Sequence, residues 1–354
     1  MRSVILSDNK PGHYKQSLGI VEKMPECQVE WLEVRFRRKW RDNLLRVFMC
    51  IFGGVPLSTS VIHTLLRWSL TSDSYNALAQ LQTVNIILST GSSVAAVNLL
   101  LGRILGAKTV TCRRPSPVGV RYFDLAILPM LSWDSATQKS NVCKTIGVPT
   151  PISPDTLNAY RERLNREMNL SDSPRIGLLL GGADRHETIT IEDAKRLSEI
   201  SKAVSAEMRA QILVTTSRRT PPDVSSHLAS MMEQTEWCPL FIEANTPSEL
   251  EDPYQAILAL SDLLIVTADS FSMACEAASS GRKVIVLTLS QESARLPKRY
   301  KVYEYMEQNA IVSRCRLNSL AQHIESALTS DVPNARLQDT ETAVHAIRRL
   351  MARN

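Results

Sequence analysis

The sequence lacks the short motifs that mark several common classes of enzyme and metalloprotein. It contains no Gly-x-Gly-x-x-Gly, no Walker phosphate loop and no Cys-x-x-Cys, so ordinary dinucleotide binding, P-loop chemistry and a zinc cluster lose support. The seven cysteines are scattered and odd in number, which favours reduced thiols in a cytosolic compartment. Aromatic residues make up only 5% of the chain. That is few for the stacking platforms of single-stranded nucleic acid, and no nucleic-acid partner is expected.

The chain also lacks a long uninterrupted hydrophobic run. Residues 47–66 contain no Lys, Arg, Asp or Glu, but Gly53, Gly54 and Pro56 interrupt them, as do hydroxyl residues. We therefore expect two short helices joined by a turn, able to dip into a membrane interface, rather than a membrane-spanning helix. Near the start of the sequence a short strand leads at once into a Gly/Pro turn, which is unlike a secretory signal.

Strand-length runs of apolar and β-branched residues recur along the 354-residue sequence. They are continuous rather than alternating, and most are separated by helix-length segments, which is typical of parallel strands covered on both faces. Two sets of five runs predict an α/β fold of two Rossmann-like doubly wound domains that face each other across a cleft. The runs are residues 4–6, 29–34, 84–88, 109–111 and 125–128, then 176–180, 211–215, 240–243, 263–266 and 284–287.

A proline-rich segment at residues 147–154 divides the two sets of strands. Its three prolines prevent a helix or a central strand. We therefore expect an N-terminal, acceptor- and membrane-facing domain over residues 1–150 and a C-terminal, nucleotide-binding domain over residues 151–354, joined by a hinge. A polar helix is predicted directly after the hinge. The helical segment 334–353 can pack back on the first domain.

Charge is distributed unequally between the two halves. Residues 1–150 hold 18 Lys and Arg against 9 Asp and Glu, whereas the net charge of the whole chain is only +5. The densest basic run leads into an apolar segment at residues 44–52, and this combination suits a helix lying on an anionic lipid surface. A solvated charge run beside a core helix is the alternative. The residues expected at the membrane are Arg35, Arg37, Arg38, Lys39, Trp40 and Arg41.

The loop after the first strand carries the candidate catalytic residues. Ligands of doubly wound sheets bind at the carboxyl ends of the strands, where loops and helix N-termini converge. His13 follows Gly12 near the start of the next predicted helix, where it is placed to take a proton from an acceptor hydroxyl, with Asp8 as the other candidate base. Lys10 and Gly12 are expected to contact the acceptor or an anion. The alternative is that His13 only caps or packs this turn.

Arg113 and Arg114, after a later strand of the first domain, are a further candidate for binding an anionic acceptor. A guanidinium binds carboxylate or phosphate through paired donors. Surface charge in a loop is an equally simple explanation.

Two loops of the second domain are candidates for binding a diphosphate. Gly181 and Gly182 follow a buried strand, and glycines allow backbone amides to approach phosphate closely. Arg185 adds a guanidinium to the same loop. Ser217 and Arg218, after the next strand, are a second candidate contact. Both patterns also occur in purely structural turns.

The most informative segment joins a buried strand to a predicted helix near residue 270. Hydroxyls and free amides at a helix N-terminus suit phosphate. Glu276, about a turn further along, is placed to accept hydrogen bonds from a ribose diol. A capping box from Ser272 would need Glu or Gln at position 275, which is Cys275. The donor-binding residues expected here are Asp269, Ser270, Ser272, Met273 and Glu276.

These motifs together resemble a known family. The pattern Thr267-x-Asp269-Ser270-x-Ser272-Met273-x-x-Glu276 is similar to the nucleotide-sugar site of GT-B glycosyltransferases. Combined with Lys10-Pro11-Gly12-His13-x-x-Gln16-Ser17-Leu18-Gly19, it resembles more closely the mitochondrial-fission ELM-like family, across nearly the whole chain. That resemblance implies a GT-B fold and, for plant members, a role at the mitochondrial outer surface. A looser resemblance to lipid-linked murein glycosyltransferases rests on the Gly-His turn, the Gly-Gly loop and the Ser…Glu helix.

One hypothesis and two alternatives follow. The hypothesis is a glycosyltransferase that moves a sugar from a nucleoside-diphosphate donor to a lipid-linked or anionic acceptor at the cytosolic face of a membrane. Since the sequence has no Asp-x-Asp, we expect no metal ion, and helix dipoles with Arg and Ser donors would neutralise the leaving diphosphate. No cofactor is expected. The alternatives are a non-catalytic, membrane-associated adaptor, as the family resemblance suggests, and a nucleotide-sugar epimerase on the same fold.

Overall fold

The computed structural model describes residues 1–352 except 169–171, 185, 245, 290–296 and 333. The chain divides into two compact units, one formed by Met1–Pro151 with Gln338–Asn354 and the other by Ile152–Leu337. The expected boundary after residue 150 lies one residue from the observed one. Helix α13 (Asp339–Met351) belongs to the first unit, so the second unit stops short of it.

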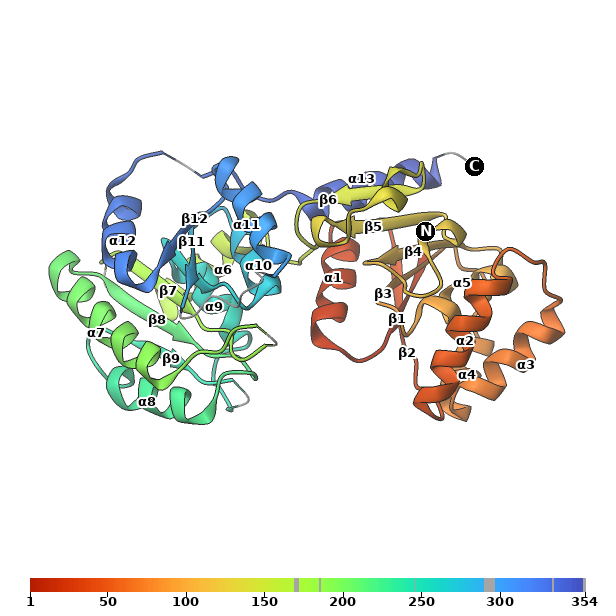
Figure 1. Cartoon of the computed structure of the whole chain (residues 1–354), viewed down its shortest axis with the longest axis horizontal. Helices are drawn as coiled ribbons and strands as arrows, with labels where there is room; N and C mark the ends of the chain where they lie inside the picture. The colour runs from red at the N-terminus through yellow and green to blue at the C-terminus, as the bar shows by residue number, and fades with distance from the viewer. Residues whose placement is uncertain (169–171, 185, 245, 290–296, 333, 353–354) are drawn as a thin grey trace. The chain divides into compact units, whose positions relative to one another are not determined.

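The first unit is built on a parallel sheet of six strands in the order β2-β1-β3-β4-β5-β6. Helices cover both of its faces (Figure 1), α1 and α13 on one and α2 to α5 on the other. The strands are β1 (Arg2–Ser7), β2 (Gln28–Glu33), β3 (Ile86–Thr90), β4 (Lys108–Cys112), β5 (Leu125–Pro129) and β6 (Val142–Thr145). The helices are α1 (Pro11–Glu22), α2 (Lys39–Phe52), α3 (Thr59–Ser69), α4 (Ser72–Ala79) and α5 (Ala95–Leu105), with short 3-10 turns at Val120–Tyr122, Met130–Ser132 and Ser135–Gln138.

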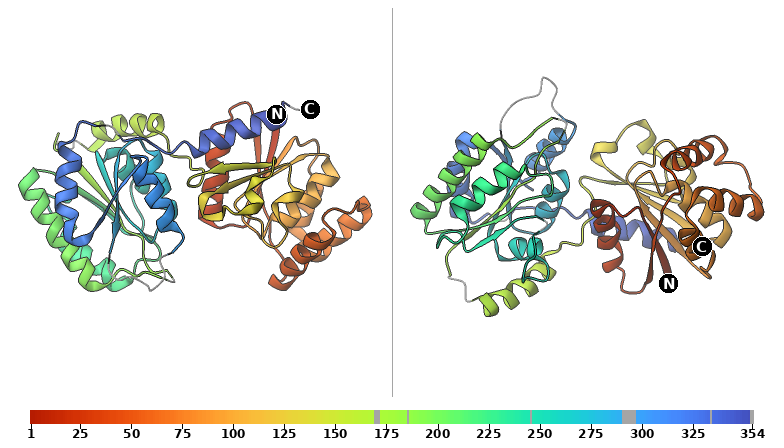
Figure 2. Two further views of the ribbon diagram at one scale, coloured as in Figure 1. Left: turned by 45° about the horizontal axis from the view of Figure 1, so that its top comes forward. Right: turned by 90° about the horizontal axis from the view of Figure 1, so that it is seen from below.

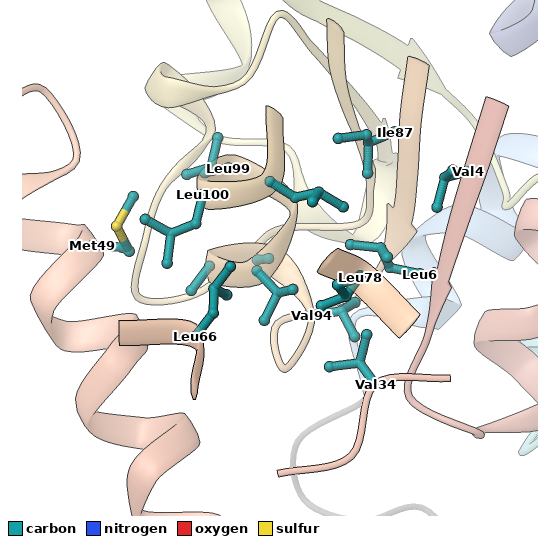
Figure 3. Close-up of a cluster of buried hydrophobic side chains, with 14 of the residues drawn as sticks. Val4, Leu6, Val34, Met49, Leu66, Leu78, Ile87, Val94, Leu99 and Leu100 are labelled. Atoms are coloured by element: carbon teal, nitrogen blue, oxygen red, sulfur yellow. The ribbon is translucent and has the colours of Figure 1, made fainter. Parts of the chain in front are cut away.

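Strand residues of this sheet alternate between its two faces, as the pleat requires. Val4, Leu6 and Ile87 join the core formed with α2, α3 and α5 (Figure 3). Ile5 and Leu88 join a separate core with α1 and α13. Because both faces are buried, the strands are continuous apolar runs.

The second unit has the same plan, with a parallel sheet in the order β12-β11-β10-β7-β8-β9. Helices α7, α8 and α12 cover one face, and α6, α9 and α10 the other, with α11 beside α10 (Figures 1 and 2). The strands are β7 (Arg175–Leu179), β8 (Gln211–Thr215), β9 (Leu240–Ile242), β10 (Leu263–Thr267), β11 (Lys283–Thr288) and β12 (Ser313–Arg316). The helices are α6 (Pro154–Met168), α7 (Ile191–Met208), α8 (Pro222–Met232), α9 (Pro253–Leu260), α10 (Phe271–Ser279), α11 (Arg299–Gln308) and α12 (Leu320–Thr329), with a 3-10 turn at Leu317–Ser319.

All ten predicted strands are present, and the predicted class of two doubly wound α/β domains is confirmed. The sequence missed two strands, β6 and β12, which lie at sheet edges. Each is four residues long and carries Lys or Arg, as exposed edges often do. The uncharged stretch at residues 47–66 forms the end of α2, a turn and part of α3, as predicted. Within the described residues, every helix is too short or too polar to cross a membrane.

Candidate functional site

Each sheet has a switch point, where the chain leaves a central strand in opposite directions and the loops above it diverge. In the first sheet the switch point lies between β1 and β3, and in the second between β7 and β10. Most of the predicted site residues lie in the loops that follow these strands and their neighbours β4 and β8. The two units are described separately below.

Asp8 follows β1 and gathers a cluster of polar groups. Its carboxylate accepts hydrogen bonds from Ser93 Oγ at 2.6 Å, from Lys10 Nζ at 2.6 Å and from His13 Nδ1 at 3.0 Å. Burial alone would raise the pKa of Asp8, but the bonds from His13, Lys10 and Ser93 outweigh burial and hold that pKa well below its usual range. Asp8 is therefore a stable carboxylate that orients its neighbours. It is a weak proton acceptor, which argues against the expectation that Asp8 itself is the base.

His13 is held at both ring nitrogens. Nη1 of Arg113 lies 3.2 Å from Nε2 of His13, and because a guanidinium can only donate, Nε2 is the acceptor. The hydrogen-bond network thus assigns the ring proton to Nδ1, where it is donated to Asp8. This tautomer leaves the Nε2 lone pair as the proton-accepting site. For His13 to act as a base, Arg113 must give up that lone pair to a substrate hydroxyl.

Gly91, in the loop after β3, makes room for the imidazole. Its φ is +91°, and a Cβ built there would overlap the His13 ring, including Nδ1 at 2.8 Å. Neither Gly91 nor Ser93 was expected from the sequence. The signal that could have found them is the Gly-Ser-Ser run that closely follows the predicted strand at residues 84–88.

The other predicted residues of the first unit are more scattered. Lys10 is exposed and pairs with Asp8. Gly12 lies in the first turn of α1. Its φ is not positive, and a Cβ built on it would meet no atom within 4 Å. No turn geometry requires glycine at that position. Arg114 pairs with Asp134 at 2.5 Å, so of the two neighbouring arginines only Arg113 contacts His13.

Gly181 and Gly182, after β7, use their amides within the protein. The amide of Gly181 donates to Thr267 Oγ1 at 2.7 Å, and that of Gly182 donates to Asp269 Oδ2 at 2.7 Å. In this conformation both amides donate within the protein, and the expected contact of this loop with a diphosphate stays a prediction. A Cβ at Gly181 would overlap the carboxyl group of Asp269, so packing explains the glycine. Arg185, expected in the same loop, lies outside the described residues.

Asp269 and the loop after β8 form a connected group. Burial raises the pKa of Asp269, which is 8% exposed, and Nη2 of Arg219 lies 3.2 Å from its Oδ2. Ser217 Oγ donates to the carbonyl of Gly181 at 2.6 Å, so this hydroxyl also serves the loop itself. Arg218 is exposed. Arg219, which was not among the expected site residues, therefore links the loop after β8 to Asp269.

The N-terminus of α10 is the part of the predicted donor site where hydroxyl groups and helix amides come together. Ser270 is the N-cap residue, and its side chain makes no capping hydrogen bond. The amides of the first helical turn lack intrahelical partners. Ser272 is exposed and Met273 half-buried. Hydroxyls and amides thus lie at the start of a helix, and phosphate binding there stays a prediction.

Glu276 is buried inside the second unit, at 6% exposure. Its partner is Tyr254 of α9, whose pKa is raised well above its usual value by burial and by the neighbouring Glu276 carboxylate. A ribose diol would have to join or replace this contact. Nothing in the sequence pattern pointed to Tyr254.

A buried arginine fixes the other side of the Gly-Gly loop. Arg299 of α11 donates to Asp184 Oδ2 and to Glu187 Oε2, at 2.6 Å each. The Tyr300 hydroxyl also donates to Glu187. Within the described residues, no group of three or more His, Cys, Asp or Glu side chains is arranged to hold a metal ion.

Comparison with known sequences places this geometry in context. A sequence model of the family described as Mitochondrial fission ELM1 matches residues 11–351. The chain is also 29% identical, over 110 residues, to the UDP-N-acetylglucosamine--N-acetylmuramyl-(pentapeptide) pyrophosphoryl-undecaprenol N-acetylglucosamine transferase of Synechococcus sp. (strain JA-2-3B'a(2-13)), a match that covers 30% of this chain and 29% of the transferase. The chain spans about 30% of the length of the curated relatives it matches.

Solved structures share the fold across the whole chain. The UDP-GlcNAc 2-epimerase from Methanocaldococcus jannaschii has a TM-score of 0.56 at 12% identity, covering 99% of this chain and 100% of the epimerase. The UDP-GlcNAc 2-epimerase from Neisseria meningitidis bound to UDP-GlcNAc has a TM-score of 0.55 at 14% identity, covering 100% of both chains. The predicted GT-B type of two Rossmann-like domains is thereby confirmed.

Proposed function

This chain belongs to the mitochondrial fission ELM1 family, and from that premise we propose that it is a metal-independent glycosyltransferase. It moves a sugar from a nucleoside-diphosphate donor to a lipid-linked or anionic acceptor at the cytosolic face of a membrane. Two similarities support the proposal. The fold is shared with enzymes that act on UDP-sugars, and part of the sequence resembles a transferase with an undecaprenol-linked substrate.

The observation that carries the proposal is the hydrogen bond between Asp8 and His13. It supports a role for His13 Nε2 in accepting the proton of the acceptor hydroxyl, while Asp8 stabilises the imidazolium that forms. Proton transfer of this kind contributes roughly 10²–10⁴-fold to a rate. Lys10, beside Asp8, and Arg113, beside Nε2 of His13, supply positive charge that would attract an anionic acceptor.

In the reaction, the acceptor oxygen forms a bond to the anomeric carbon of the donor. The bond between that carbon and the phosphate oxygen breaks, and the electron pair leaves with the diphosphate. The first-turn amides of α10, the Ser270 and Ser272 hydroxyls and the exposed Arg218 are our candidates for stabilising the added negative charge. Glu276 would hold the ribose after the ribose diol joins or replaces its contact with Tyr254.

A nucleotide screen tests the proposal. The melting temperature of the chain is measured with uridine, guanosine, adenosine and cytidine diphosphates in the presence of EDTA. We expect one of them to raise it, and Ser270→Ala to weaken the effect. Ser279→Ala, at the other end of α10, is the control and should leave the effect unchanged.

The alternatives give different results. An adaptor with a vestigial pocket gives no shift with any nucleotide. An epimerase binds the nucleotide but releases an epimerised donor without any acceptor. A transferase consumes the sugar nucleotide in proportion to the acceptor glycosylated, and this consumption continues in EDTA if no metal is needed.

A further inference from the structure

Exposed apolar side chains concentrate on α2, α3 and the turn between them. Of the thirteen large hydrophobic residues that are exposed in the described chain, eight lie between residues 40 and 68. Four of these, Trp40, Leu44, Val47 and Ile51, follow one another at spacings of four, three and four residues along α2 and so share one helix face. We call these four residues the α2 stripe. Their exposures are 51%, 51%, 46% and 64%.

The face of α2 opposite the stripe packs into the core of the first unit. Leu45 and Met49, on the opposite face of α2, are buried at 1% and 0% exposure. They pack in one cluster with Leu66 of α3. Figure 3 shows Met49 and Leu66 of this cluster. The stripe is therefore held outward by a well-packed helix, and its exposure does not come from a frayed segment.

Beside this helix pair lies an open pocket of about 710 Å³. Residues at helical spacing along α3, among them His63 and Arg67, line it together with Arg37, Arg41, Trp68 and Tyr75. Three guanidiniums and an imidazole thus share one pocket, and the described residues that line it include no carboxylate. Such a pocket suits a phosphoryl group.

Backbone and aromatic contacts position the three guanidiniums. Arg37 Nε donates to the carbonyl of Leu70 at 2.7 Å. Arg41 Nη1 donates to the carbonyl of Trp68 at 2.5 Å, and its guanidinium lies 5.2 and 5.1 Å from the ring centres of Trp40 and Trp68. Arg67 lies 5.0 Å from the ring centre of Tyr75. Each guanidinium keeps further N–H donors for a ligand.

The charge around the pocket is strongly positive. Residues 35–70 carry seven Lys and Arg and one acidic residue, Asp42. Asp42 is paired with Arg46 at 2.8 Å. In the described chain, Arg37, Arg41 and Arg67 form no ion pair with a carboxylate. An anionic lipid surface complements both this charge and the apolar stripe.

We propose that the α2–α3 pair docks on a bilayer containing anionic phospholipid, with the α2 stripe in the interfacial layer and a lipid phosphoryl headgroup in the pocket of Arg37, Arg41 and Arg67. The inference rests on the membrane location in the proposed function and assigns residues and a headgroup chemistry to it. It does not depend on glycosyl transfer. The pocket would select anionic lipid, and the stripe would add affinity by burying apolar area.

Cosedimentation of the full chain with vesicles tests this proposal. Vesicles of phosphatidylcholine alone are compared with vesicles in which about 30% of the lipid is phosphatidylglycerol, with an expected tenfold or greater preference for the latter. Arg41→Gln with Arg67→Gln removes two charges from the pocket. Arg35→Gln with Arg38→Gln removes two charges from the same basic segment outside the pocket lining. We expect the pocket pair to lose at least about tenfold more binding than the control pair.

A second comparison tests the stripe. Leu44→Ser with Val47→Ser alters exposed positions and should weaken vesicle binding while the melting temperature stays near wild type, whereas Met231→Ser, an exposed apolar residue of the second unit, should not. Equal losses from the two arginine pairs would overturn the pocket and indicate diffuse attraction. Binding of inorganic phosphate without vesicle binding would overturn the docking. If vesicle binding fails while the nucleotide shift persists, the docking is wrong and the transferase proposal stands.

Discussion

Nδ1 of His13 lies 3.0 Å from Oδ1 of Asp8, and this hydrogen bond sets which ring nitrogen carries the proton. The two residues are five positions apart, on a loop and a helix start that follow the same strand. The short loop therefore positions His13 so that its ring proton lies on Nδ1 and Nε2 is unprotonated. The predictions below begin from this pair.

Replacing Asp8 by Asn should disable the His13 base. An amide can present an N–H to Nδ1 and so favour the opposite tautomer, in which Nε2 is protonated. We expect the rate of sugar transfer to fall by about 10²–10⁴-fold, while the nucleotide-induced shift in melting temperature is retained. Asp73→Asn, at an exposed position on α4, is the control. An Asp8→Asn variant with normal turnover would show that His13 is not the base or does not need Asp8.

Gly91 and Gly119 provide a matched pair. Their φ angles are +91° and +87°, so alanine at either position costs about 1–3 kcal/mol of backbone strain. A Cβ at Gly91 would also overlap the His13 ring, whereas Gly119 has open space. Gly91→Ala should therefore lose activity at least tenfold beyond Gly119→Ala, as measured by initial rates. Equal losses would mean that the ring position is unimportant.

Arg218 and Arg219 separate donor binding from stability. Arg219 holds the buried Asp269 but is itself partly exposed, so Arg219→Ala should lower the free energy of unfolding by about 1 kcal/mol. Arg218→Ala should change it by less than about 0.5 kcal/mol. We expect it to weaken nucleoside-diphosphate binding about tenfold, because in our proposal this exposed guanidinium donates hydrogen bonds to the phosphate. Calorimetric titration and denaturant unfolding measure the two effects. The reverse pattern would assign Arg219 to the donor site.

Asp339 makes the stability of the first unit depend on pH. Burial raises the pKa of Asp339 to about 6, even though its oxygens accept from the amides of Ile146 and Gly147 at 2.9 and 2.7 Å. The folded state then binds the proton more tightly than the unfolded chain. The stabilisation is complete below about pH 4 and is lost as pH rises through about 6.

Denaturant unfolding between pH 4 and pH 7 checks this dependence. The Asp339→Asn variant, although less stable, should lose the part of the pH slope that Asp339 causes. Asp331→Asn, at an exposed position, should keep it. A slope that is identical in the wild type and in Asp339→Asn would assign the pH dependence to other groups.

The fold could be predicted because its central strands are buried on both faces. Ile87 and Leu88, for example, belong to cores on opposite sides of the first sheet, so the sequence shows an unbroken apolar run. Edge strands such as β12 carry no such pattern, since Arg314 and Arg316 reach solvent. The Pro-rich segment also marked the point near Pro151 where the chain passes from the first unit to the second. Proline is incompatible with the interior of a helix or of a central strand, so a connection was expected there.

The candidate sites were predictable only as far as local sequence determines them. A Gly, Ser or His after a strand is visible in the chain, and Asp8 and His13 do meet. The partners Ser93 and Tyr254 come from other elements and depend on packing. The Gly-Gly motif was visible in the same way, but the donation from the Gly182 amide to Asp269 was not, because Asp269 follows a different strand.

The position of α13 affects the order in which the protein can fold during translation. Ala343, Val344 and Ile347 complete the apolar cluster on one side of the first sheet, yet the ribosome makes them only after all of the second unit. A nascent first unit would therefore emerge with part of that apolar face exposed to solvent. It would need chaperone protection until α13 is synthesised.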